Sequence, residues 1–199
     1  MTGEILDALP ARRGHFLLES GYHTDLWLTL DAMFVDPRAV APLVAALAGK
    51  LRPYDITAVC GPMLGGAFLA QAVATLLGAR FYHTEPAPAS ADPGLFRATY
   101  TLPPALRDRV AGERVAVVDD VISAGSSVRA TVDALAAAGA STMAVGALLL
   151  LGDAAQEHFA EQGIPVEAVS RSAFDLWAPD ECPLCRANVP VQDPRIADA

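Results

Sequence analysis

Residues 114–128 read Arg114-Val-Ala-Val-Val-Asp-Asp-Val-Ile-Ser-Ala-Gly-Ser-Ser-Val128, and this stretch decides the fold. Its first part, residues 115–118, has the length and β-branched content of a buried strand. Two adjacent acids end that run, and a turn of small residues leads into a helical pattern that begins at about Val128. The order of strand, acids, glycine-containing turn and helix is typical of an α/β protein.

The turn has the properties of a phosphate-binding site. Backbone N–H groups of the turn and of the helix start are unpaired donors, and the helix dipole favours negative charge there. Asp119 and Asp120 would repel a phosphate, but they suit hydroxyl groups or a metal ion. A phosphorylated ribose carries a phosphate and, beside it, vicinal hydroxyl groups. We therefore expect the turn amides to bind the phosphate of such a ligand. These amides belong to Ser123, Ala124, Gly125, Ser126 and Ser127.

The same residues resemble a known motif. The run Val117-Val-Asp-Asp-Val-Ile-Ser-Ala-Gly-Ser-Ser127 is similar to the phosphoribosyl-pyrophosphate motif of the type I phosphoribosyltransferases. The resemblance implies the fold of that family, a central, mostly parallel sheet flanked by helices. It also implies one domain over residues 1–199, with a small hood built from about 1–30 and 165–199. The alternative is an ordinary strand, turn and helix of a doubly wound sheet, in which the acids only cap the helix.

Composition limits the possible functions. Hydrophobic residues make up 53% of the 199 residues, enough for a sizeable core in one domain. A net charge of −9 argues against nucleic-acid or anionic-membrane binding. The sequence shows no signal peptide and no apolar run long enough for a membrane span. With three cysteines, no disulfide framework is implied, and we expect a cytoplasmic protein.

The N-terminal segment predicts a short helix at Glu4–Leu9 and then a hairpin that turns at Ser20-Gly21. The hairpin resembles that of the orotate phosphoribosyltransferases, in which it belongs to a hood over the base. The resemblance makes Phe16 and Ser20 substrate-binding candidates, and it extends to Leu18, Gly21, Thr24 and Trp27.

Three residues of this hairpin need separate comment. Glu19 stands where many members of the orotate group carry a lysine near the substrate, so the local charge is reversed. His15 and His23 are expected to be partly exposed hairpin residues.

A second glycine loop follows the predicted strand 56–60. It reads Gly61-Pro-Met-Leu-Gly-Gly66 and leads into a predicted helix over about 67–77. Open amides at that helix start suit another phosphate. By resemblance this is the pyrophosphate loop, where the family often has a non-proline cis peptide. The candidate ligand-binding residues are Met63, Leu64, Gly65 and Gly66.

The family's catalytic flap corresponds here to residues 84–96, a Pro- and Ala-rich loop between strands predicted at 80–83 and 95–102. In the family this flap contributes Arg, Lys and His across a dimer interface and excludes water. Residues 84–96 contain none of these types, which leaves Arg97 as the catalytic candidate. The resemblance also implies a homodimer.

Two further positions depart from the orotate pattern or lie outside it. The apolar strand predicted at 141–151 is followed by Gly152-Asp153, where orotate enzymes usually place an arginine that grips the orotate carboxylate. Arg171 could reach the site from elsewhere. In the tail, Cys182 and Cys185 supply two of the four ligands that a structural zinc ion needs, and no histidine lies near them in the sequence. We therefore assign no metal ligands; two reduced structural thiols and a zinc ion shared across a dimer are the alternatives.

The expected reaction is transfer of ribose 5-phosphate from phosphoribosyl pyrophosphate to a nucleobase, orotate by resemblance, with release of pyrophosphate. Asp119 and Asp120 would bind the ribose hydroxyls, and Mg²⁺ would enter bound to the donor substrate. The alternative is a paralogue that binds the donor or a nucleotide without turnover, as a sensor or partner subunit.

Overall fold

The computed structural model describes residues 11–88 and 98–194. Its centre is a six-stranded sheet in the order β5-β4-β3-β6-β7-β8. All neighbouring pairs are parallel except β4 and β5, which are antiparallel. The mostly parallel sheet that the sequence predicts is therefore present. The strands are β3 (Ala58–Pro62), β4 (Arg80–Pro86), β5 (Tyr100–Thr101), β6 (Arg114–Ile122), β7 (Ser141–Leu151) and β8 (Val166–Ser172).

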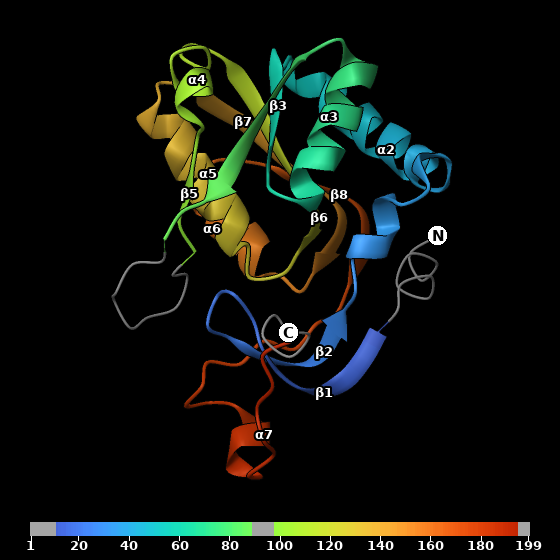
Figure 1. The fold of residues 1–199 in the computed structure, drawn as a ribbon, viewed down its shortest axis with the longest axis vertical. Coiled ribbons are helices and arrows are strands. Elements are labelled where there is room, and N and C mark those ends of the chain that lie inside the picture. Colours follow the sequence, from blue (N-terminus) through green and yellow to red (C-terminus); the bar gives the residue numbers. More distant parts are fainter. Residues whose placement is uncertain (1–10, 89–97, 195–199) are drawn as a thin grey trace.

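Helices cover both faces of this sheet (Figure 1). On one face, α2 and α3 bury apolar side chains such as Leu47 and Leu69 against β3, β6 and β7. On the other face, α5 and α6 bury Leu135 and Phe159, and the short α4 packs Leu106 on the same cluster. The helices are α2 (Pro37–Leu51), α3 (Gly65–Leu77), α4 (Pro104–Arg107), α5 (Ser126–Ala137) and α6 (Ala154–Glu161), with 3-10 turns at Asp31–Phe34 and Arg52–Tyr54.

A separate two-stranded hairpin, β1 (Ala11–Leu17) and β2 (His23–Leu28), forms the hood (Figure 1). The C-terminal segment, with the one-turn helix α7 (Pro183–Arg186), runs beside the hairpin. Backbone hydrogen bonds join Leu17 N to Gln192 O at 2.8 Å and His23 N to Trp177 O at 2.8 Å. Because β8 belongs to the main sheet, the C-terminal part of the hood begins beyond Ser172 rather than at residue 165.

The expectation that His15 and His23 are partly exposed is wrong. Their exposed fractions are 1% and 7%. The C-terminal segment causes this burial, because it covers the face of the hairpin that the two imidazoles share. The sequence of residues 14–28 does not indicate that the C-terminal segment packs over them.

The two strands that flank the flap differ from the sequence prediction. β4 extends to Pro86, and within residues 98–102 only Tyr100 and Thr101 form strand β5; the first part of the strand predicted over 95–102 lies outside the described residues. Prolines at 86 and 88 lack the N–H that a longer ladder would need. Arg97 and the helix predicted at Glu4–Leu9 lie outside the described residues. In the part of the chain that the structure describes, no helix combines the length and apolar character that crossing a bilayer requires.

Candidate functional site

The site lies at the carboxyl ends of β3 and β6, which are parallel neighbours in the middle of the sheet. The chain leaves β3 into α3 on one face and leaves β6 into α5 on the other face. In open α/β sheets such a divergence opens a crevice in which ligands bind. The two loops that the sequence predicts to hold phosphates therefore meet at one place.

The two adjacent acids are held in fixed positions at the end of β6. Asp119 and Asp120 are 8% and 7% exposed. Asp119 Oδ2 accepts a hydrogen bond from Ser127 Oγ at 2.9 Å, and Asp120 Oδ1 accepts one from Val121 N at 2.8 Å. Burial raises the pKa of Asp119 well above its ordinary value, the charge of Asp120 raises it further, and the Ser127 bond opposes the shift. A ligand with hydroxyl donors or a cation would relieve this repulsion.

The turn after the acids has the shape that the sequence predicts. Gly125 caps α5 with φ +78°, a conformation that favours glycine. The first amides of α5 have no partner within the helix. Ser126 Oγ is buried, and among the described residues it has no hydrogen-bond partner. An orphaned buried hydroxyl beside open amides is what an anion site requires, so the turn fits a phosphate.

The second glycine loop packs directly on the acids. A Cβ atom on Gly65 would lie 2.1 Å from Asp120 Oδ2, and one on Gly66 would lie 2.7 Å from Asp119 Oδ1. A Cβ on Gly61 would lie 2.0 Å from the carbonyl oxygen of Gly66. Only residues without a side chain let the two loops approach so closely. Sequence reasoning noted these glycines but could not tell that they face the carboxylates.

The predicted non-proline cis peptide is present between Met63 and Leu64. Met63 N donates to Thr84 O at 2.9 Å, which fixes the loop to the end of β4. Met63 and Leu64 are 38% and 56% exposed, so this loop lies at the surface of the protein.

The hood closes a cavity of about 350 Å³ over the phosphate turn. Ser20 and Trp27 face Ser123–Ser127 across this cavity. Phe16, by contrast, is 1% exposed and does not line the cavity. Its ring centroid lies 6.2 Å from that of Trp27, so Phe16 supports the wall from behind. The structure thus brings Ser20 to the site and places Phe16 beneath it.

Glu19 also lines this cavity, and it connects the hood to the base of the flap. Tyr100 on β5 donates its hydroxyl to Glu19 Oε1 at 3.5 Å. Burial, followed by the charge of Glu19, raises the pKa of Tyr100, so the phenol remains a donor. The acid that replaces the family's lysine therefore has a structural partner.

A second cavity of about 550 Å³ adjoins the first and shares Trp27 and Ser123 with it. Leu151, at the end of β7, and Phe174 form its apolar wall. Among the described residues that line it, Arg12 is the only base. The guanidinium of Arg12 also lies 5.8 Å from the ring centroid of Phe16. Sequence reasoning missed Arg12 because its register opposite Trp27 in the hairpin appears only in the fold.

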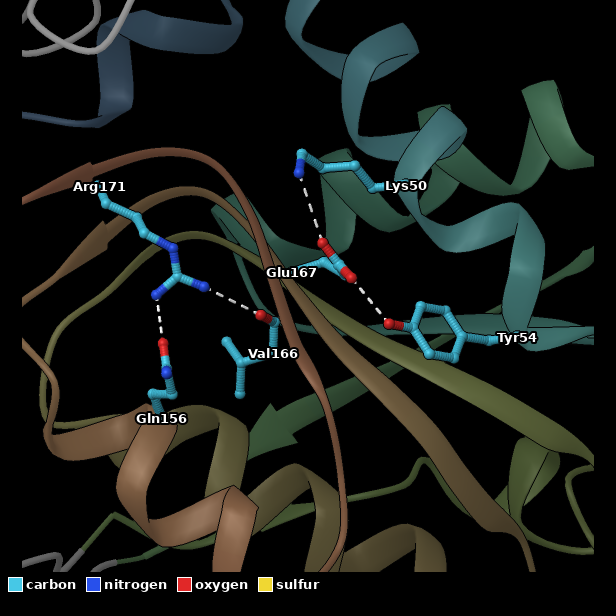
Figure 2. A network of polar contacts seen from close by, with 6 residues as sticks. All are labelled: Lys50, Tyr54, Gln156, Val166, Glu167 and Arg171. Atoms are coloured by element: carbon cyan, nitrogen blue, oxygen red, sulfur yellow. Dashed lines mark hydrogen bonds and ion pairs between the residues drawn. The ribbon is translucent and has the colours of Figure 1, made fainter.

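Two other cations contact residues that do not belong to the site (Figure 2). Arg171 on β8 donates to Gln156 Oε1 and, at 3.0 Å, to Val166 O. Lys50, the one lysine of the sequence, lies 3.5 Å from Glu167, which also accepts from Tyr54 at 2.7 Å. Arg171 therefore does not replace the missing carboxylate-binding arginine, and Arg97 lies outside the described residues.

Arg129 is a further residue that sequence reasoning missed. A Cβ on Gly125 would lie 3.7 Å from Arg129 Nε, so the guanidinium lies behind the phosphate turn. Its Nη2 donates to Ala154 O at 3.1 Å, and burial lowers its pKa. The spacing of four residues from Gly125, about one helical turn, was the available signal.

The donor set of this site fits Mg²⁺ carried by a substrate. Asp119 and Asp120 are hard oxygen donors, which Mg²⁺ prefers, and Mg²⁺ usually binds with one or two carboxylates and substrate phosphates. The charge of Asp120 also raises the pKa of Asp119, and a cation bound between the two carboxylates would relieve this repulsion. Asp119 and Asp120 would be the residues that hold such an ion.

Comparisons with known proteins agree with this geometry. The phosphoribosyl transferase domain family matches residues 33–180. The chain belongs to the phosphoribosyltransferase family, as the resemblance of residues 117–127 indicates.

Particular relatives are more specific. An orotate phosphoribosyltransferase of Thermotoga maritima is 31% identical over 98% of this chain and 97% of its own length. One from Helicobacter pylori is 31% identical over 90% of each chain. Among solved structures, orotate phosphoribosyltransferase from Aeropyrum pernix has a TM-score of 0.64 at 23% identity, covering 86% of this chain and 93% of its own. Adenine phosphoribosyltransferase from Thermoanaerobacter pseudethanolicus has a TM-score of 0.66 at 17% identity, covering 86% and 100%. The last two likenesses establish the fold.

Proposed function

We propose that this protein is an orotate phosphoribosyltransferase of pyrimidine nucleotide biosynthesis. The observation that carries the proposal is the contact of Gly65 and Gly66 with Asp120 and Asp119, which joins two phosphate-binding loops over one pair of carboxylates. The names of the full-length relatives support orotate as the acceptor. The size of the two adjoining cavities supports a ligand with a phosphate at one end and a base at the other.

In the proposed reaction, the bond from the anomeric carbon to pyrophosphate breaks and its electron pair leaves on the pyrophosphate oxygen. A bond from that carbon to a ring nitrogen of orotate forms, and the proton of that nitrogen leaves with the pyrophosphate. Mg²⁺ bound to the donor would supply charge neutralisation for the leaving pyrophosphate. Asp119 and Asp120 bind the ribose hydroxyls and favour the cationic character that develops on the ring. Amides of Ser123 to Ser127, with the hydroxyl of Ser126, hold the 5′-phosphate. Amides of Met63 to Gly66 hold the pyrophosphate.

We assign the binding of the orotate carboxylate to Arg12. Its guanidinium borders the cavity beside Ser123, and no other base lines that cavity among the described residues. A guanidinium binds a carboxylate through two parallel hydrogen bonds. Supplied from the hood, Arg12 would take the role that the family gives to an arginine after β7.

The surface between α2 and α3 supports a homodimer. An apolar groove of about 650 Å³ lies there, and Phe68 and Leu76 on its wall are 46% and 48% exposed. Contiguous apolar surface of this kind is typical of protein interfaces. Sedimentation of the wild type as a dimer, and of Phe68→Asp as a monomer, would support this assignment. A wild type that remains monomeric at micromolar concentration would exclude it.

A cytoplasmic location is proposed on the cysteines, none of which forms a disulfide. The third, Cys60, is buried in β3, and burial raises the pKa of its thiol to about 12. A thiol of that kind is unreactive.

The test of function is pyrophosphate release from phosphoribosyl pyrophosphate with Mg²⁺ and a panel of bases: orotate, uracil, adenine, guanine and hypoxanthine. Turnover with orotate alone supports the proposal. Turnover with a purine and not with orotate would show that the acceptor base is a purine and that the assignment of orotate is wrong. Tight donor binding without release for any base would instead identify a sensor or partner subunit.

A further inference from the structure

Four metal-ligating side chains converge in the hood, away from the carboxylates. They are His15 on β1, His23 at the start of β2, Cys182 before α7 and Cys185 within α7. One ligand atom from each lies within 4.8 Å of the other three. Three of the four residues are buried, with exposed fractions of 1% for His15, 7% for His23 and 0% for Cys182.

The distances between these atoms fit a tetrahedral ion. His15 Nε2 lies 2.9 Å from His23 Nδ1 and 3.4 Å from Cys182 Sγ. Cys185 Sγ lies 3.3 Å from His23 Nδ1 and 3.8 Å from His15 Nε2. With zinc bonds of about 2.0–2.1 Å to nitrogen and about 2.3 Å to sulfur, tetrahedral ligand atoms stand roughly 3.3–3.8 Å apart. The two imidazoles would separate by a few tenths of an ångström to admit the ion.

The tautomer of His15 is also right for a ligand. Its Nδ1 lies 2.8 Å from Val189 O, and a carbonyl oxygen can only accept, so Nδ1 carries the proton. The Nε2 lone pair therefore points at the cluster. Metal-binding histidines are commonly oriented through their second nitrogen in this way.

We propose that His15, His23, Cys182 and Cys185 bind one structural zinc ion. Thiolate and imidazole ligands select zinc over the hard ions that prefer oxygen. Four protein ligands leave no open position, so the site is structural rather than catalytic. Because both histidines come from the same chain as the cysteines, no ligand from a second subunit is needed.

The size of the hood explains what such an ion would do. A two-stranded hairpin and a one-turn helix bury too little apolar surface to be stable alone. Zinc would join residues 15 and 23 to residues 182 and 185, at opposite ends of the sequence. The ion would thereby fix the hairpin that carries Ser20 and Trp27 over the phosphate turn. This role does not depend on which base the enzyme uses.

The full-length protein, expressed with zinc in the medium and dialysed, is to be analysed by mass spectrometry of metals and by X-ray absorption at the zinc edge. We expect one zinc per chain with two sulfur and two nitrogen neighbours. Cys185→Ser should hold less than about a tenth of that zinc, because three ligands bind far more weakly than four. Cys60→Ala and His158→Asn are matched controls that should retain it fully.

Thermal melting provides a second readout that needs no variant. Removal of zinc by a chelator should lower the melting temperature of the wild type, and added Zn²⁺, but not Mg²⁺, should restore it. The proposal is overturned if the wild type binds no zinc after exposure to it, if Cys185→Ser retains the full amount, or if intact mass shows a Cys182–Cys185 disulfide in protein purified without oxidant.

Discussion

Replacement of Gly65 by alanine should displace a carboxylate without removing it. The new Cβ would lie 2.1 Å from Asp120 Oδ2 and 2.8 Å from Asp120 Cγ. Ordinary contact begins at 3.4 Å, so the carboxylate must move by about 1.3 Å, the difference between these distances. Asp120 is 7% exposed and its Oδ1 already accepts from Val121 N, so it cannot move freely.

The size of the effect follows from that displacement. Misplacing a group at a reacting centre by about 1 Å can cost about 10²-fold in rate, so kcat/KM with orotate should fall at least that much in Gly65→Ala. Overpacking should also destabilise the fold by about 1–3 kcal/mol. At about 2–4 °C per kcal/mol, the melting temperature should fall by roughly 2–12 °C, which leaves the protein folded for assay at 25 °C.

Gly49→Ala is the matched control, because its Cβ would meet nothing within 4 Å and the residue lies inside α2. It should keep wild-type kinetics and gain about 0.5–1 kcal/mol of stability. Steady-state pyrophosphate release and thermal melting measure both variants. If Gly65→Ala retains kcat/KM within about twofold of wild type, the two loops do not cooperate as described.

Three further substitutions test single contacts. Asp119→Asn removes a carboxyl group whose pKa in the folded state is raised above 3.8, and such a group destabilises the fold once the pH exceeds its unfolded-state pKa. The variant should therefore have a higher melting temperature than wild type near pH 7, and this difference should disappear as the pH falls toward about 4. Its activity should be lost. Ser126→Ala should weaken donor binding about tenfold by calorimetry without lowering the melting temperature, since the lost hydroxyl has no partner among the described residues. Arg12→Ala should raise KM for orotate about 10- to 150-fold and leave KM for the donor unchanged, whereas Arg13→Ala, which removes an exposed ion pair with Asp25, should change neither; equal effects from both would refute the role given to Arg12.

Elements around the donor site carry signals that are local in the sequence. Asp36 and Pro37 stand at the start of α2, and Asp36 Oδ1 accepts from Arg38 N at 3.0 Å as an N-cap does. The apolar run of residues 141–151 is strand β7 with the same bounds. The phosphate turn could be located because strand, acids, glycine and helix start are contiguous in the sequence. Sequence patterns of this kind depend on neighbours along the chain and therefore remain visible without a structure.

Contacts between distant segments could not be predicted in the same way. Gly65 and Asp120 meet because β3 and β6 are adjacent, an order that neither segment encodes alone. His15 and Cys182 come together because the tail crosses the hairpin. In the sequence alone, Cys182 and Cys185 supply two metal ligands, and the histidines that complete the set lie far away along the chain. Arg12 likewise acquired a role only when the hairpin register placed it opposite Trp27.

The most direct test of the account is calorimetric titration of phosphoribosyl pyrophosphate with Mg²⁺ into the wild type and into the Asp119→Asn, Asp120→Asn double variant. We predict saturable binding at one site per chain of the wild type. We expect at least about tenfold weaker binding to the double variant, because each acid is assigned a charge-assisted hydrogen bond to the ribose. Absence of heat with the wild type, or equal affinity in both proteins, would contradict the assignment of these carboxylates to the donor ribose.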